Sequence, residues 1–92
     1  MLGRRIYELR RAMGWSQVEL ARRLNISKQT VSNWENENIM PSVVMLIRMS
    51  RLFQVSTDYL LGLEAIPRLS IEGLPNAVVA HLSMIVEDLR EK

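Results

Sequence analysis

The sequence predicts an all-α protein in which five short helices in residues 1–62 are followed by a sixth helix within residues 75–92. Apolar residues recur at spacings of three and four positions, which is the period of an amphipathic helix. Serine precedes four of the expected helices, where its hydroxyl accepts a backbone hydrogen bond from the first turn. Glycine follows two of them, as expected where a helix ends.

Length and composition limit what the chain can be. It has 92 residues, 48% hydrophobic and 24% charged, which suits one small domain with one appended element. It contains no cysteine, so the core has neither disulfides nor thiolate metal ligands. A domain of this size buries only about 60–65% of its unfolded surface, so we expect well-packed helices or a partner subunit. No run approaches the roughly 20 apolar residues that span a bilayer, and no targeting segment is apparent, so we expect a cytoplasmic protein without membrane contact.

The first two helices are expected over residues 2–13 and from residue 17 to about residue 24. Gly14 ends the first helix. Ser16 and Glu19 then have the spacing of a capping box, in which the hydroxyl and the carboxylate each bond a backbone N–H of the other residue. The apolar positions are Leu2, Ile6, Leu9 and Met13 in the first helix, and Val18, Leu20, Ala21 and Leu24 in the second.

The third helix, expected over residues 28–36, has one apolar and one polar side. Asn25 precedes it and tolerates left-handed backbone angles, and Ser27 supplies a new N-cap. Val31 and Trp34 fall on the apolar side, so we expect Trp34 to pack in the core rather than to contact a ligand. The polar residues that point elsewhere are Lys28, Gln29, Ser32 and Asn33.

Two more serine caps begin the fourth and fifth helices. Ser42 precedes a strongly apolar segment that continues through Leu52. Ser56 precedes a short helix over residues 57–61, which Gly62 closes. Residues 63–74 contain proline and glycine without a sustained period, so we interpret them as a linker.

The last helix is expected at about residues 75–91, with Pro75 as its first residue. Its apolar residues repeat at four, three and four positions, the spacing of a coiled-coil seam. Such a stripe either folds back on its own domain or pairs with a copy of itself, and we favour pairing into a homodimer. The expected dimerisation residues are Val78, Leu82, Ile85 and Leu89.

The second and third helices together have the layout of a helix-turn-helix. Two short helices joined by about three residues allow the second to enter the major groove of DNA. We expect Ala21 and Val31 where the two helices cross, because a small and a β-branched side chain permit a steep approach. Asn25 supplies the left-handed position of the turn, where glycine is the least strained choice and Asn the next.

At these residues the sequence resembles the phage-repressor-like (Xre/Cro type) helix-turn-helix regulators. The matching elements are Leu9-Arg10, Ser16-Gln17, Leu20-Ala21, Ser27, Thr30-Val31-Ser32, Trp34-Glu35, Pro41 and Asp58-Tyr59-Leu60-Leu61-Gly62. They occur in the order and spacing of the family and cover residues 4–62, about two thirds of the chain. The resemblance implies a five-helix domain that binds double-stranded DNA in transcription regulation, with its third helix in the major groove.

The resemblance also implies roles for individual residues. Lysine can donate to guanine O6 and N7, and Gln or Asn can bond adenine N6 and N7 together. The expected base-reading residues are Lys28, Gln29, Ser32 and Asn33, and the expected phosphate-contacting residues are Gln17, Ser27, Asn36 and Arg10. Gln17 begins the second helix, whose N-terminal amides suit a phosphate. Arg10 and Glu35 also match positions that form an ion pair in similar repressors.

Two departures from the family pattern affect these expectations. Asn25 stands where glycine is usual, which implies modest strain. Residues 37–40 contain no Lys or Arg, although many relatives have a basic residue there that contacts the DNA backbone. We therefore expect a weaker electrostatic grip and a greater need for two subunits on a two-fold-symmetric operator, where such proteins most often repress transcription.

Other classes of function remain as alternatives. Residues 1–62 carry nine basic and five acidic side chains, net +4, whereas residues 63–92 carry three and five, net −2. The acidic end leaves open a protein-binding adaptor or an antitoxin-type autoregulator, and an antagonist protein at the last helix would displace the dimer partner. No phosphate loop, nucleophile with a base, or ligand cluster around His81 is present, so we expect no enzymatic activity, cofactor or metal.

Overall fold

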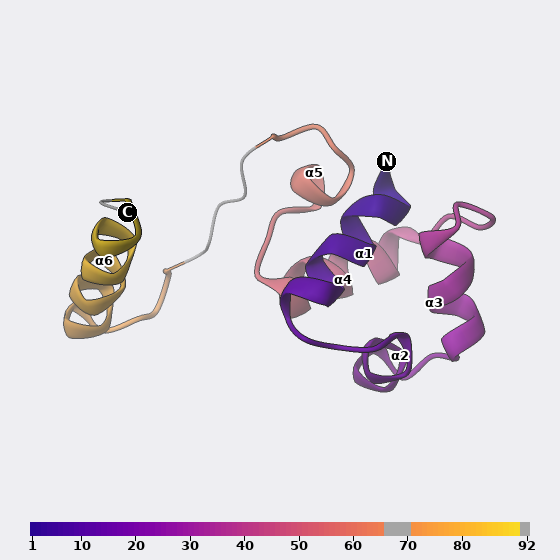
Figure 1. Ribbon diagram of the computed structural model, residues 1–92, viewed down its shortest axis with the longest axis horizontal. Coiled ribbons are helices and arrows are strands. Elements are labelled where there is room, and N and C mark those ends of the chain that lie inside the picture. Colours follow the sequence, from indigo (N-terminus) through magenta and orange to yellow (C-terminus); the bar gives the residue numbers. More distant parts are fainter. Residues whose placement is uncertain (66–70, 91–92) are drawn as a thin grey trace.

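The structure, a computed structural model, describes residues 1–65 and 71–90, and every regular element within these ranges is helical (Figure 1). The prediction of an all-α protein is therefore confirmed. The helix ends agree with the expected ones to within one or two residues. The helices are α1 (Leu2–Ala12), α2 (Gln17–Leu24), α3 (Lys28–Glu35), α4 (Val43–Phe53), α5 (Thr57–Leu60) and α6 (Asn76–Arg90).

Serine side chains begin α2, α3, α4 and α5 as the sequence predicts. The capping box at the start of α2 is only half formed, because the carboxylate of Glu19 accepts a hydrogen bond from Arg22 Nε at 2.8 Å instead of reaching back. The guanidinium of Arg22 thereby holds the pKa of Glu19 below its ordinary value. The serine hydroxyls accept backbone N–H groups of Glu19 (3.1 Å, Ser16), Thr30 (3.1 Å, Ser27), Met45 (3.2 Å, Ser42) and Tyr59 (2.9 Å, Ser56).

The core lies between α1, α2, α3, α4 and α5. Ala21 and Val31 are both buried, and α2 contacts α3 as the predicted helix crossing requires. Trp34 is also buried, which confirms its expected place in the core. The largest side chains without solvent contact are Ile6, Leu20, Leu24, Val31, Met49 and Leu60.

Two apolar residues of the stripes predicted for the first two helices lie outside this core. Met13 is the C-cap of α1 and is 49% exposed, because the helix ends before the side chain reaches a neighbour. Val18 lies in the first turn of α2 and is 59% exposed. Both deviations occur at a helix end, where the period continues but the packing surface does not.

Gly3 lies at a close approach between two helices, where α1 meets the end of α3. A Cβ atom at Gly3 would lie 2.5 Å from the carbonyl oxygen of Trp34 and 2.6 Å from that of Glu35. These distances are far inside van der Waals contact with backbone atoms, so this position requires glycine. Because Gly3 has no side chain, α1 can pack directly against the backbone at the end of α3.

The sixth helix differs from the other five. No residue of α6 is buried, and Figure 1 shows the helix to one side of α1 to α5. A pocket of about 570 Å³ brings Gln54, at the end of α4, together with Leu82 and Val86 of α6.

The helix α6 begins at Asn76, directly after the Pro75 that was expected to be its first residue. Parts of the expected linker (66–70) and of the expected last helix (91 onward) lie outside the described residues. Among the helices of the described ranges, none is long and apolar enough to cross a membrane.

Candidate nucleic-acid interface

The turn between α2 and α3 has the predicted backbone geometry. Asn25 has φ 56° and ψ 48°, in the left-handed region. The N–H of Ile26 donates to the carbonyl of Ala21 at 2.9 Å, which closes the end of α2. Because Asn adopts these angles at modest cost, it replaces glycine here without changing the turn.

The outer face of α3 carries the four expected base-reading residues. Lys28 and Gln29 are exposed, and Ser32 and Asn33 are half-buried. Gln29 Nε2 donates to Asn33 Oδ1 at 3.1 Å, so the two amides lie side by side one turn apart. The remaining polar atoms of this pair, the Gln29 oxygen and the Asn33 nitrogen, provide one acceptor and one donor. An adenine edge in the major groove presents the matching donor and acceptor.

A buried ion pair lies behind α3 and links it to α1. Arg10 Nε and Glu35 Oε2 are 2.7 Å apart, and Arg10 Nη2 donates to Glu35 Oε1 at 3.0 Å. Arg10 Nη1 also donates to the carbonyl of Trp15 at 2.9 Å. The two charged side chains are only 7% and 6% exposed, and the hydrogen bond that Arg10 donates to Glu35 raises the pKa of Arg10 above its ordinary value. The ion pair implied by the family resemblance is thus confirmed.

This arrangement changes the role assigned to Arg10. The sequence places Arg10 among the phosphate contacts, but its guanidinium is directed at Glu35 and Trp15 and has little surface left for an anion. A buried charge that loses its partner is strongly destabilising, so we assign Arg10 the positioning of α3 instead of phosphate binding.

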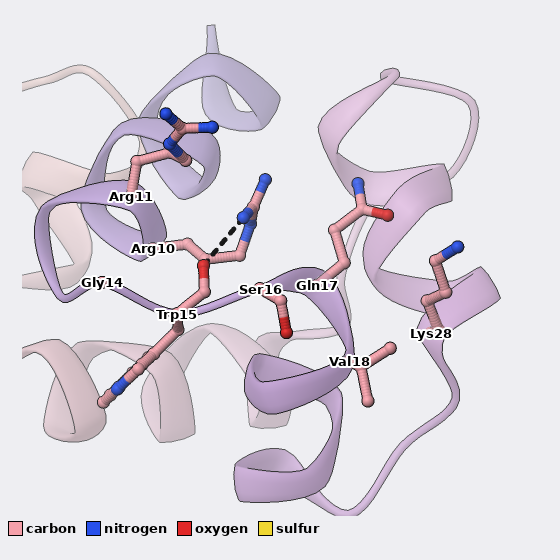
Figure 2. A pocket seen from close by; sticks show the side chains of 8 residues that line it. All are labelled: Arg10, Arg11, Gly14, Trp15, Ser16, Gln17, Val18 and Lys28. Carbon is pink, nitrogen blue, oxygen red and sulfur yellow. Dashed lines mark hydrogen bonds between the residues drawn. The ribbon is translucent and has the colours of Figure 1, made fainter.

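Gln17 connects the ion pair to the start of α2. Its Nε2 donates to Glu35 Oε1 at 3.1 Å, which fixes the side chain between α2 and α3. A pocket of about 580 Å³ opens beside it, with Arg11 and Lys28 on its rim (Figure 2). In Figure 2 the side chains of Gln17 and Lys28 project to the same side of the two helices. A helix N-terminus between two cations is a suitable environment for a phosphate group.

The remaining expected phosphate residues lie at the two ends of α3. The Ser27 hydroxyl caps the helix and lies 2.8 Å from Thr30 Oγ1. Asn36 is the C-cap residue, is exposed, and donates from Nδ2 to Ser32 Oγ at 3.4 Å. Together with Gln17 they are spaced along the same α2–α3 unit that carries the base-reading residues.

A cationic face of α1, which the sequence leaves open between a solvated surface and a DNA contact, borders this surface. Arg4 and Arg11 lie on either side of Tyr7, with their guanidinium carbons 5.9 and 5.7 Å from the centre of its ring. A second pocket of about 410 Å³ brings Arg4 and Tyr7 together with Asn36. Arg4, Tyr7 and Arg11 are three and four positions apart, and residues at these spacings share one face of a helix. The sequence therefore contains the pattern of this face.

The loop after α3 turns its acidic residue back onto α1. Glu37 has φ 62°, and its Oε1 accepts a hydrogen bond from the backbone N–H of Gly3 at 2.7 Å and from the amino group of Met1 at 3.0 Å. These donors hold the pKa of Glu37 below its ordinary value of 4.5. The carboxylate therefore caps the start of α1, and the loop joins α1 and α3 a second time.

The chain belongs to the helix-turn-helix family, whose sequence profile matches residues 6–60. It is 37% identical over 87 residues to the HTH-type transcriptional regulator ImmR of Bacillus subtilis, covering 95% of this chain and 68% of ImmR. It is 33% identical over 72 residues to the uncharacterized HTH-type transcriptional regulator YobD of the same organism, covering 78% of this chain and 64% of YobD.

Solved structures agree with this assignment. SinR in complex with DNA, described as the master regulator for biofilm formation, is 34% identical, with a TM-score of 0.61 over 66% of this chain and 98% of that one. The SinR–SinI complex has a TM-score of 0.62 at 24% identity, over 98% of this chain and 79% of that one, and shows the fold alone. The chain is a DNA-binding transcriptional regulator, as the resemblance in its sequence implied.

Proposed function

We propose that this regulator binds a two-fold-symmetric operator as a homodimer and represses transcription by occupying a promoter. The observation that carries the proposal is the outer face of α3, where the hydrogen-bonded amides of Gln29 and Asn33 lie beside Lys28 while the back of the helix is buried. The buried pair of Arg10 and Glu35 holds this face in a fixed orientation. A rigid helix with exposed polar side chains suits direct readout of base edges in the major groove.

Phosphate contacts supply most of the affinity in this proposal. We assign them to Gln17, Ser27 and Asn36, with Lys28 able to reach either a base or a phosphate. Residues 37–40 contain no Lys or Arg, so the loop after α3 adds no cation to those of α1 and α3 that can release counterions from DNA. Two domains on adjacent half-sites double the number of these cations, which is the physical reason for expecting a dimer.

The exposed stripe of α6 supports the protein–protein part of the proposal. No residue of α6 is buried, and an apolar helix face of this kind normally has a partner. One similar structure is a complex of SinR with SinI. We propose that an antagonist protein competes for the same stripe of α6 in this chain and so releases the operator. No catalytic step, cofactor or metal belongs to the proposal, and it places the chain with DNA in the cytoplasm.

Selection of bound sites from a random duplex library, followed by titration of the selected site at two salt concentrations, tests the proposal. We expect an inverted repeat with half-sites about one helical turn apart and an affinity that falls steeply with salt. Because folding is monitored separately by circular dichroism, failure to enrich any site with folded protein contradicts operator binding. Binding with a flat salt response contradicts phosphate contacts by the cations Arg11 and Lys28, which lie beside Gln17, because only cationic side chains release counterions.

A further inference from the structure

The apolar stripe of α6 has a defined register. Its four expected dimerisation residues are 40 to 65% exposed and follow the spacing of one coiled-coil seam. In heptad notation Val78 and Ile85 are d positions, and Leu82 and Leu89 are a positions. The residues that flank this seam are Val79 and Val86 at the e positions, and His81 and Asp88 at the g positions.

The spacing of the seam residues, four, three and four, is the same when read from either end of α6. In an antiparallel pair of helices, an a residue packs against a d residue of the other helix. Leu82 then meets the partner's Ile85, and by symmetry Ile85 meets the partner's Leu82. Val78 and the partner's Leu89 form the outer layers in the same way. All four seam residues are used, and no layer is left without an apolar neighbour.

The flanking residues distinguish the two orientations. In the antiparallel pair the g positions face each other, so His81 lies beside the partner's Asp88 on both sides of the two-fold axis. The e positions also meet, and Val79 beside the partner's Val86 widens the seam. In a parallel pair, g faces the next e of the other helix, which places His81 against the partner's Val86. Only the antiparallel pairing joins an acid with a base and an apolar residue with an apolar residue.

We propose that α6 pairs with α6 of a second copy of this chain in antiparallel orientation. The proposal rests on the homodimer proposed above and specifies its geometry. The two-fold axis crosses the helices between Leu82 and Ile85. The first residues of the two helices then lie at opposite ends of the pair, about 20 Å apart at 1.5 Å per residue. The two DNA-binding domains thus leave the pair in opposite directions, as two half-sites on either side of an operator axis require.

The size of the interface sets how strong this pairing is. Fifteen residues of α6 provide only about two heptads, which bury less than the roughly 800 Å² per partner of a standard stable interface. We therefore expect a weak dimer that operator DNA strengthens by holding both domains together. Disulfide trapping is suited to such a dimer, because it captures pairs that form only transiently.

The natural chain contains no cysteine, so single introduced cysteines report on the orientation without interference. The test uses full-length Val78→Cys and Leu89→Cys proteins, oxidised separately and as a mixture, with the products identified by mass spectrometry. In the antiparallel pair the mixture forms the 78–89 disulfide. Each protein alone stays uncrosslinked, since 11 residues separate equal positions by about 16 Å along the axis, against a Cα–Cα limit of about 7 Å.

The outcomes separate this inference from the proposed homodimer. A disulfide in Leu89→Cys alone shows parallel helices and overturns the antiparallel pairing while the homodimer stands. Sedimentation of the natural chain as a monomer at every concentration, with no disulfide in any sample, overturns both. A dimer in which neither the mixture nor the single proteins crosslink overturns α6 as the interface.

Charge changes at the flank provide a second measurement. His81→Lys is expected to tighten the dimer about fivefold, because it places a full cation beside the partner's Asp88 at two symmetric sites. Asp88→Lys is expected to weaken it, and adding His81→Glu to Asp88→Lys is expected to restore it. Ala77→Lys, with the same added charge outside the seam and flanks, is the matched control. Equal effects of His81→Lys and Ala77→Lys overturn the proposed contact.

Discussion

The five-helix body and α6 are built from similar apolar residues but use them in opposite ways. In the body, each of α1 to α5 buries at least one side chain in a shared core, whereas α6 buries none. An isolated helix of about 15 residues is marginally stable in water, so we expect the proposed pairing to stabilise α6. The body packs its apolar residues into a core that orients α3, whereas α6 leaves its apolar residues on the surface.

The largest expected effect comes from matched leucines in the two regions. Leu20→Ala removes a wholly buried side chain and should lower the free energy of unfolding by about 2–5 kcal/mol. Leu82→Ala truncates a residue that is 40% exposed and should leave unfolding of the body unchanged while weakening the dimer. Urea denaturation followed by tryptophan fluorescence, with sedimentation for the dimer, measures both. A comparable loss of body stability in the two variants would show that α6 packs on its own domain.

Glycine substitutions give the next effect. Gly3→Ala forces a Cβ atom against the backbone of α3 and should cost about 1–3 kcal/mol or more, because neither helix backbone can move freely. Gly73→Ala is the control, since Gly73 has φ 81° but open space around it. Its strain lies before α6 and should not change the thermal unfolding of the body. Equal stability of Gly3→Ala and the natural chain would contradict the close approach of α1 and α3.

Changes on the outer face of α3 should act on DNA binding alone. Gln29→Ala and Asn33→Ala should each cost about 1–3 kcal/mol on the selected operator and relax base preference there. Arg48→Ala on α4 is a control that also removes a polar side chain from the body. Fluorescence anisotropy with selected and scrambled duplexes measures the difference. Unchanged specific binding by both variants, with the fold intact, would show that α3 is not the reading helix.

The smallest expected effect is the pH dependence that Glu37 contributes. Its pKa is lowered in the folded chain, chiefly by the N–H of Gly3, so its stabilisation is present above pH 4.5 and is lost as the pH falls through the lowered value. Glu37→Gln should therefore destabilise the body at pH 6 and differ less from the natural chain at pH 3. Urea denaturation at both values measures this. Asn38→Gln, which changes no titratable group, is the control. An equal loss of stability in Glu37→Gln at both pH values would contradict the role of the Glu37 carboxylate.

Sequence reasoning succeeded where the determinants were local. The four serine caps and the left-handed Asn25 depend on residues within three positions of each other, and all five were predicted. Trp34 was correctly assigned to the core because its spacing from Val31 defines one face of a helix. The local pattern also predicted the polar face of α3. The roles of its residues in reading DNA bases stay predictions.

The features that the sequence did not predict depend on contacts between distant segments. Gly3 meets Trp34 and Glu37 only after α1 has packed across α3, and no spacing within α1 indicates this. Tyr7 joins the candidate interface for the same reason. Arg10 was assigned both an ion pair and a phosphate, and only its burial distinguishes the two roles.

The residues of α3 that pack in the core are not the residues that are proposed to read DNA bases. Val31 and Trp34 hold the helix in place, whereas Lys28 and Gln29 are exposed and bear no part of the core. A library randomised at these two exposed positions keeps the internal framework intact. In the proposed binding mode, we expect variation there, in the laboratory or in evolution, to change the operator that is bound while the core stays the same.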